Sequence, residues 1–145
     1  MISGKVVLHL EEEKMKLSTK GRYGLMAMYR LSKNKSDRPM SLKDIADIEN
    51  LSEAYLEQLF SLLKKNGLVI SVRGAGGGYQ LAKPAKEIPI GDIINALEGE
   101  IKLSCCDSGK RIECSKVNGC ATKDILQKLQ SKMEEVMDSL TLADM

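Results

Sequence analysis

With 145 residues and 43% hydrophobic composition, the chain can form one small domain with an appended helix. No apolar run reaches the roughly 18–20 residues of a membrane span and no signal peptide is evident, so a cytoplasmic protein without a membrane segment is expected. The net charge of +2 is unevenly divided, because residues 16–83 carry twelve Lys or Arg against six Asp or Glu. This excess favours a polyanionic partner for the first half of the chain, although a solvated basic face gives the same pattern.

Three helices are predicted after an N-terminal extension over residues 1–14. Ser18 and Thr19 are N-cap candidates for a helix to about Ser32, whose core-facing positions are expected to be Tyr23, Met26, Ala27 and Leu31. A short helix over residues 42–49 should bury Leu42, Ile45 and Ala46. The third helix, capped by Ser52 and ended by Asn66-Gly67, should bury Leu56, Leu59, Phe60 and Leu63. A short helix, a tight turn and a second helix form the helix-turn-helix pattern.

A β-hairpin is predicted directly after these helices. Residues 68–72 are rich in branched side chains, residues 74–78 are rich in glycine, and residues 79–82 return as a second strand. A glycine-rich loop can instead cradle a nucleotide phosphate, but that function requires a helix directly after the glycines. The hairpin is therefore interpreted as the wing of a winged helix-turn-helix domain over residues 15–83.

The rest of the chain predicts a linker with a short helix (residues 84–103), a loop (residues 104–121) and a long helix with a tail (residues 122–145). Apolar residues of the long helix recur at the spacing of a helix-pair seam: Leu126, Leu129, Met133, Val136 or Met137, and Leu140. Since little of the chain remains to cover this seam, a homodimer is expected. The predicted fold class is mainly α with a small β wing, a winged helix-turn-helix domain plus a long C-terminal dimerisation helix.

The third helix and the wing carry side chains suited to reading double-stranded DNA. Glu57 and Gln58 can bind base edges in the major groove, and Ser52 and Tyr55 can hold phosphate. Arg73 can enter a minor groove or hold the DNA backbone, and a close approach to DNA is allowed by Gly76, Gly77 and Gly78. Each residue can also be ordinary solvated surface, and a scaffold or metallochaperone without DNA binding is a further alternative.

The same stretches resemble the IscR/CymR/NsrR family of dimeric bacterial transcription regulators over residues 15–100. The matching motifs are KGRY (20–23), LSEAYLEQLF (51–60), KNGLV (65–69), VRG (72–74), GGGY (76–79) and GDII (91–94), and the ending SLTLAD (139–144) also fits. The resemblance implies operator contacts from Ser52, Tyr55, Glu57, Gln58 and Arg73. Ala54 replaces a DNA-facing serine of the IscR branch, so the resemblance does not imply the operator sequence of IscR.

Four cysteines lie in the predicted loop: Cys105, Cys106, Cys114 and Cys120. In a cytosolic chain, clustered cysteines favour a metal, cluster or redox site over structural disulfides, and thiolates suit iron–sulphur clusters. The resemblance implies a cluster of the 2Fe-2S kind held by Cys106, Cys114 and Cys120. The family's histidine, three residues after the last cysteine, is Lys123 here, and Cys105 is a candidate fourth or alternate metal ligand.

The main functional prediction is a regulator of iron–sulphur cluster biogenesis genes that senses cluster or redox status. The alternative is a regulator of cysteine metabolism of the CymR type, controlled by a partner enzyme or by thiol oxidation without a cluster. A zinc site, a thiol redox switch and inert thiols are further readings of the cysteines, although the spacing lacks the C-x-x-C pairs typical of zinc sites. An enzyme is not expected, because no histidine accompanies the cysteines and no paired carboxylates suggest a catalytic pocket.

Overall fold

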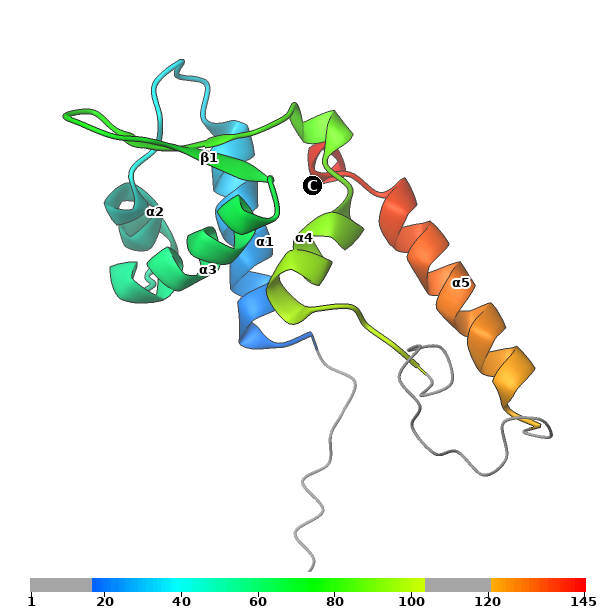
Figure 1. The fold of residues 1–145 in the computed structure, drawn as a ribbon. Helices are drawn as coiled ribbons and strands as arrows, with labels where there is room; N and C mark the ends of the chain where they lie inside the picture. The colour runs from blue at the N-terminus through cyan, green and yellow to red at the C-terminus, as the bar shows by residue number, and fades with distance from the viewer. Residues whose placement is uncertain (1–16, 104–120) are drawn as a thin grey trace, which may run out of the picture.

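Five α-helices and a two-stranded hairpin form the part of the protein that the computed structural model describes, residues 17–103 and 121–145. With two short 3-10 helices, the elements are α1 (Thr19–Lys33), α2 (Leu42–Glu49), α3 (Glu53–Lys65), β1 (Val69–Val72), β2 (Gly78–Leu81), η1 (Ala85–Glu87), α4 (Ile90–Glu98), α5 (Lys123–Ser139) and η3 (Leu142–Asp144) (Figure 1). Within these residues no helix is long and apolar enough to cross a membrane. The order of the elements confirms the predicted winged helix-turn-helix with a long C-terminal helix.

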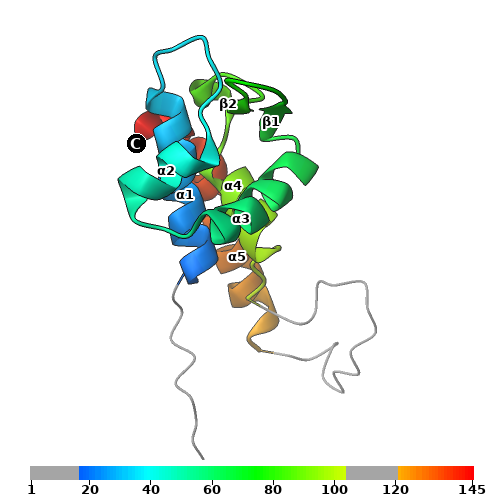
Figure 2. The same cartoon turned by 90° about the vertical axis from the view of Figure 1, so that its left-hand side faces the viewer.

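The core lies where α1, α3 and α4 meet, with the hairpin and η3 at its edges (Figure 2). Its fully buried large side chains are Met28, Ile45, Leu56, Leu59, Phe60, Leu63, Val69, Ile88, Ile93 and Leu142. Aliphatic side chains fill most of this space because the chain has one Phe and no Trp. Each buried side chain of this size contributes roughly 1.5–3 kcal/mol relative to an exposed one. The buried faces predicted for α2 and α3 are confirmed.

The first helix is capped from a distant part of the chain. Ser18 occupies the N-cap position of α1 as predicted, but its side chain makes no capping hydrogen bond there. Instead, the carboxylate of Glu98, at the end of α4, accepts hydrogen bonds from the backbone N–H of Gly21 (3.0 Å) and from the Ser18 hydroxyl. A carboxylate suits this place, because a helix N-terminus carries partial positive charge. The start of α1 is therefore fixed by the last residue of α4.

The tight turn between α2 and α3 depends on Asn50. This residue adopts the left-handed conformation (φ 54°, ψ 46°), which asparagine tolerates better than most residues. The next residue, Leu51, donates its backbone N–H to the carbonyl of Ala46 (3.0 Å), which closes the turn. These two features direct α3 across α2.

The wing is a hairpin supported by a third segment. β1 and β2 are antiparallel, with Val69 opposite Leu81 and Val72 opposite Gly78. Met40, just before α2, forms an isolated antiparallel bridge with Tyr79, through hydrogen bonds of 3.0 and 2.8 Å. The root of the wing is thereby joined to the helix-turn-helix unit.

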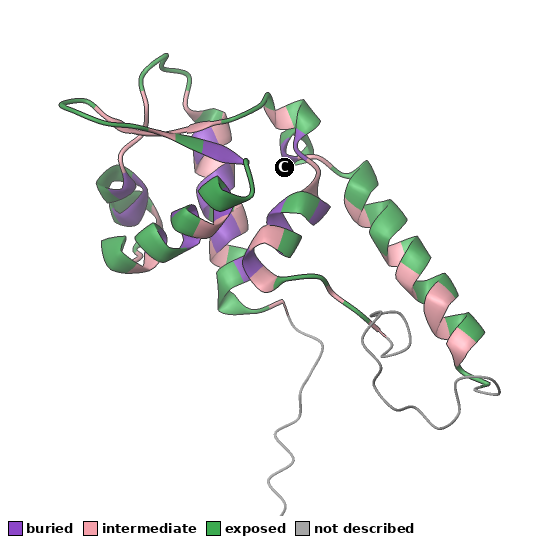
Figure 3. Ribbon diagram, in the orientation of Figure 1, coloured by how far each residue is buried: buried purple, intermediate pink, exposed green. Residues whose placement is uncertain are grey.

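Two expectations from the periodicity need correction. Met26 was expected to face the core but is exposed, whereas Met28 is fully buried, because α1 turns Gly24, Ala27, Met28 and Leu31 inward. The α5 seam is split between two faces. Met133 and Met137 lie at the cavity between α5 and α4, whereas Leu129 and Val136 are exposed. In Figure 3, α5 carries only the colours of half-buried and exposed residues. None of the residues of α5 is buried.

Candidate nucleic-acid interface

The start of α3 is set by Ser52. Its hydroxyl oxygen accepts a hydrogen bond from the backbone N–H of Tyr55 (3.1 Å), and its carbonyl accepts one from Leu56 (3.1 Å). Ser52 is therefore an N-cap residue, the role that serine favours. Its hydroxyl proton is not used in this cap and stays available to an acceptor such as a phosphate oxygen.

The outward face of α3 presents free polar groups. Glu57 and Gln58 are exposed, and within residues 17–103 and 121–145 neither side chain has a hydrogen bond or an ion pair. Ala54 lies exposed on the turn before them. A free amide and a free carboxylate on an exposed helix are the groups that bind adenine and cytosine edges in a major groove.

Tyr55 is held by α1. Its ring meets the ring of Tyr23 edge to face, with centroids 6.1 Å apart and an interplanar angle of 90°. The guanidinium of Arg22 lies 5.8 Å from the centroid of the Tyr23 ring. Since both rings are only partly buried, Tyr55 combines a packing role with an accessible position at the start of α3.

Arg73 directly follows β1 and is exposed, and it has no hydrogen bond or ion pair within the described residues. The hairpin tip and the N-terminal end of α3 project on the same side of the molecule (Figure 1). Arg73 is therefore an exposed cation of the hairpin, which lies on the same side of the molecule as the start of α3.

The wing glycines have separate structural roles. A Cβ at Gly77 would lie 2.3 Å from the carbonyl oxygen of Val72, and a Cβ at Gly78 would lie 2.3 Å from that of Met40. Gly76 has open space around it but a φ of +76°, which favours glycine. Gly77 and Gly78 are thus required for close contacts with backbone carbonyls of the protein itself. This structural role is separate from the predicted close approach of the wing to DNA.

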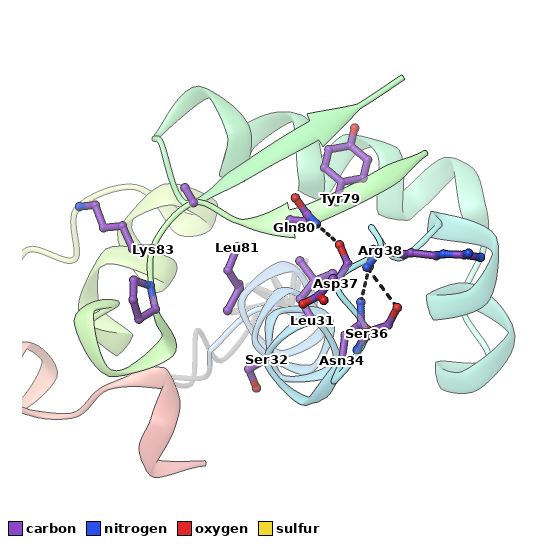
Figure 4. A pocket seen from close by; sticks show the side chains of 12 residues that line it. Leu31, Ser32, Asn34, Ser36, Asp37, Arg38, Tyr79, Gln80, Leu81 and Lys83 are labelled. Atoms are coloured by element: carbon purple, nitrogen blue, oxygen red, sulfur yellow. Dashed lines mark hydrogen bonds between the residues drawn. The ribbon is translucent and has the colours of Figure 1, made fainter. Parts of the chain in front are cut away.

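The outer side of the wing root borders a cavity of about 460 Å³ next to the segment between α1 and α2 (Figure 4). The side-chain amide of Gln80 donates to the carbonyl of Asp37 (3.1 Å) across it. Within the same segment, Asn34 donates to the carbonyl of Arg38 (2.9 Å) and Ser36 accepts from the Arg38 backbone N–H (3.1 Å). The bond from Gln80 attaches the segment between α1 and α2 to β2, and the other two bonds stabilise the segment itself.

Two cationic side chains near the interface also have internal partners. Lys64, in the last turn of α3, donates to the hydroxyl of Ser71 on β1 (2.7 Å). Arg30 of α1 forms an ion pair with Glu49 at the end of α2, and this hydrogen bond raises the pKa of the guanidinium. Arg30 therefore connects two helices, and Lys64 connects α3 to the wing.

The four predicted metal ligands, Cys105, Cys106, Cys114 and Cys120, lie outside the described residues. Lys123, which occupies the place of the family's histidine, opens α5. In residues 17–103 and 121–145 no group of three or more His, Cys, Asp or Glu side chains is arranged to hold a metal ion.

Comparison with known proteins agrees with this geometry. A family model named Rrf2, described as an iron-dependent transcriptional regulator, matches residues 17–145. The chain belongs to the Rrf2 family. CymR of Bacillus subtilis is 45% identical over 131 residues, or 90% of this chain and 89% of CymR. IscR of Yersinia pestis is 40% identical over 131 residues, or 90% of this chain and 79% of IscR.

Two solved structures of similar proteins extend the comparison. The structure of CymR, the global cysteine regulator of B. subtilis, has a TM-score of 0.71 and 44% sequence identity. The match covers 90% of this chain and 95% of the CymR chain. The structure of T. potens IscR has a TM-score of 0.69 and 46% sequence identity. The match covers 90% of this chain and 85% of the IscR chain. This Rrf2 protein is thus a DNA-binding transcription regulator of the IscR or CymR type and not an enzyme.

Sequence patterns missed two residues that position α3 and the wing, which together are called the reader below. Met40 forms the bridge to Tyr79 as a single residue, so no alternation along the chain marks it as a strand. Glu98 caps α1 across 77 residues of sequence, and the capping patterns visible in a sequence are local.

The close approach at Gly78 gives a test of the wing geometry. Gly78→Ala places a methyl group against the carbonyl of Met40, so the bridge to Tyr79 must shift, and we expect a loss of about 2 kcal/mol in the free energy of unfolding. Gly76→Ala, with open space around it, should cost about 1 kcal/mol through its backbone conformation alone. Urea unfolding of both variants measures the difference. Equal losses would contradict the crowding inferred at Gly78.

Proposed function

We propose that the protein is a cytoplasmic homodimeric regulator that binds a pseudo-palindromic operator through α3 and the wing. The observation that carries this proposal is the free polar face of α3, where Glu57 and Gln58 are exposed and have no hydrogen bond or ion pair within the described residues. The N-terminal end of this helix lies on the same side of the molecule as the tip of the wing (Figure 1). In this proposal Gln58 and Glu57 bind base edges, Ser52 and Tyr55 hold phosphates, and Arg73 enters a minor groove or holds the backbone. The glycines over residues 76–78 let the wing approach the duplex.

The dimer is proposed from the free side of α5. Ile125, Leu129 and Val136 form one exposed apolar stripe along this helix, followed by exposed Leu140 at its C-cap, with 51% of Leu129 and 56% of Val136 accessible. An exposed stripe of this kind on a helix is typical of a protein interface, and a second copy of the chain provides a matching stripe. A two-fold pair of α5 helices would place two α3 helices for two operator half-sites.

The cysteine segment is proposed as the sensor. Cys106, Cys114 and Cys120 would hold an iron–sulphur cluster of the 2Fe-2S kind, with Cys105 as fourth or alternate ligand, since an all-thiolate donor set suits iron. Similarity to proteins named IscR supports this assignment. When bound, the cluster would respond to iron supply and to redox state, and its bonds to the thiolates would hold the cysteine ligands in one arrangement. The regulated genes would be those of iron–sulphur cluster biogenesis, and the ordering would change operator affinity as a coupling free energy.

A second candidate is a regulator of cysteine metabolism that works without a cluster. The observation that favours it is a lysine, Lys123, where the resemblance to cluster-binding members implies a histidine. Sequence identity does not separate the two candidates, because it is 45% to B. subtilis CymR and 46% to T. potens IscR. In this case a partner enzyme or oxidation of the thiols would control operator binding. The two candidates share the reader and differ only in what the cysteine segment does.

The reader is tested with duplexes selected by the wild-type protein from a random pool. Gln58→Ala should lower the affinity about tenfold and relax the base preference at one position, because it removes a bidentate base contact. Arg73→Ala should weaken binding and, if it holds a phosphate, reduce the salt slope by about one. Lys86→Ala, which removes another exposed cation, on η1, serves as the control. Undiminished binding by the Gln58→Ala/Arg73→Ala double variant would refute this assignment of the reader.

The dimer is tested by changing one side chain of the apolar stripe. Leu129→Glu should convert the protein from a particle of twice 16.0 kDa into a monomer, because it places a charge in a buried helix pair. Light scattering coupled to size-exclusion chromatography gives the mass. Ser131→Glu, on the polar side of the same helix, should leave the dimer intact. A wild-type protein that is monomeric at micromolar concentration would count against the dimer.

The two candidate sensors are separated by anaerobic purification with ample iron. A cluster predicts coloured protein containing iron and sulphide, and loss of the visible absorbance in Cys114→Ala and in Cys120→Ala. Separate Cys105→Ala and Cys106→Ala variants identify which of the adjacent thiols is required. A colourless wild-type protein, together with full operator binding by a variant lacking all four cysteines, would favour the CymR-type candidate instead.

A further inference from the structure

The two flanks of α3 contact different elements of the domain. On one flank, Lys64 donates to the hydroxyl of Ser71 on β1 (2.7 Å), so this side of the helix faces the wing. Tyr55 lies nine residues earlier, which is about two and a half turns and therefore the opposite flank. There its ring meets the ring of Tyr23 on α1, with centroids 6.1 Å apart. In Figure 2, α3 accordingly lies between the hairpin above and the start of α1 below.

This arrangement matters for a helix that lies in a major groove. The groove is about 12 Å wide and is bordered by one sugar-phosphate backbone on each side. With the exposed face of α3 directed at the bases, the wing is on the side of one backbone and the start of α1 is on the side of the other. The second backbone therefore calls for a cation on α1.

Arg22 is an exposed cation at the start of α1. Its guanidinium lies 5.8 Å from the centroid of the Tyr23 ring, the same ring that packs against Tyr55. A contact with a ring face restricts the guanidinium without using its N–H donors. A guanidinium can bind a phosphate through two parallel hydrogen bonds, so these donors suit an oxyanion outside the protein.

No acidic group of the described residues neutralises Arg22. Arg30 and Lys64 have internal partners, whereas Arg22 forms no ion pair in the part of the chain that the structure describes. The carboxylate of Glu98, close to the start of α1, accepts hydrogen bonds from Gly21 and Ser18 instead. Glu98 thereby occupies the first backbone N–H groups of α1, and the side chain of Arg22 remains as the group that can hold an anion.

We propose that Arg22 binds a phosphate group of the operator, on the backbone across the major groove from the wing. The proposal rests on the proposed placement of α3 in that groove. The DNA-binding surface then has three parts, which are the wing, the exposed face of α3 and the start of α1. Arg22 adds affinity and fixes the register of α3 without a base preference of its own. The stacked rings of Tyr23 and Tyr55 relate its position to the start of α3.

The test measures operator binding by the full chain at a series of salt concentrations. Arg22→Gln removes the charge and keeps a long side chain that favours helices. We expect binding roughly five- to tenfold weaker for every operator sequence, and a salt slope smaller by about one per protomer. Arg22→Lys keeps the charge and should keep the slope.

Lys33→Gln is the matched control. Lys33 is also exposed on α1 and lies 5.2 Å from the centroid of a tyrosine ring, that of Tyr29. It follows Arg22 by eleven residues, about 16 Å along the helix, so it lies at the other end of α1. Its variant should bind as the wild type does. The urea midpoint should be the same for all of these variants.

Ethylation interference locates the phosphate. Arg22→Gln should lose the interference at one phosphate position in each half-site, and this position should differ from any that is lost in Arg73→Ala. Loss at the same phosphate in both variants would overturn the assignment to the opposite backbone.

The remaining outcomes separate this contact from the proposed reader. Wild-type affinity and slope in Arg22→Gln would overturn the proposal. Weaker binding with an unchanged slope, or with a lower urea midpoint that accounts for it, would also overturn it, since Arg22 would then only support the fold. If Arg22→Gln lowers the slope but the Gln58→Ala/Arg73→Ala double variant binds undiminished, the reader assignment fails and the phosphate contact stands. If the wild type binds no duplex, both fail.

Discussion

The contact between Phe60 and Tyr79 is the constraint on which the reader depends. Phe60 is the single phenylalanine of the chain and is fully buried on the inner face of α3, and its ring centroid lies 4.8 Å from that of Tyr79 on β2. The backbone of Tyr79 in turn pairs with Met40 in front of α2. One tyrosine therefore relates the wing, α3 and α2 to each other, so that Arg73 and Gln58 have a fixed relative position before any DNA is bound.

The second half of the chain is built onto this domain at defined points. Glu98 of α4 caps α1, and α1 carries Tyr23, which packs on Tyr55 at the start of α3. At the other end of α4, the backbone N–H of Leu142 donates to the carbonyl of Ile88 (2.9 Å), which returns the end of α5 to the domain. These contacts connect the stems of the cysteine segment with α3. In the proposed function, a ligand bound at the cysteines would influence α3 through these contacts, as two sites coupled by one packed network.

The sequence was sufficient for the elements whose cause is local. Ser52 caps α3, the apolar spacing of α3 predicts its buried face, and the glycines between the strands predict the hairpin. Features set by distant residues could not be predicted, because no local pattern marks the bridge at Met40 or the cap by Glu98. The sequence predicts a single apolar seam on α5, because the apolar residues cover a wide arc around the helix. Only the contact with α4 separates them into a face toward α4 and an exposed face. The same limit applies to the site: its residue types were visible in the sequence, whereas the close contact of Gly78 with the Met40 carbonyl required the structure.

Footprinting of an operator selected by the wild-type protein tests the central claim most directly. Two α3 helices related by the two-fold axis of a dimer should protect two inverted half-sites whose centres are separated by roughly 10–10.5 base pairs or a multiple of that spacing. The protection should disappear from both half-sites together in Leu129→Glu. A single protected site without symmetry, or protection that stays unchanged in the monomeric variant, would contradict the dimeric reader.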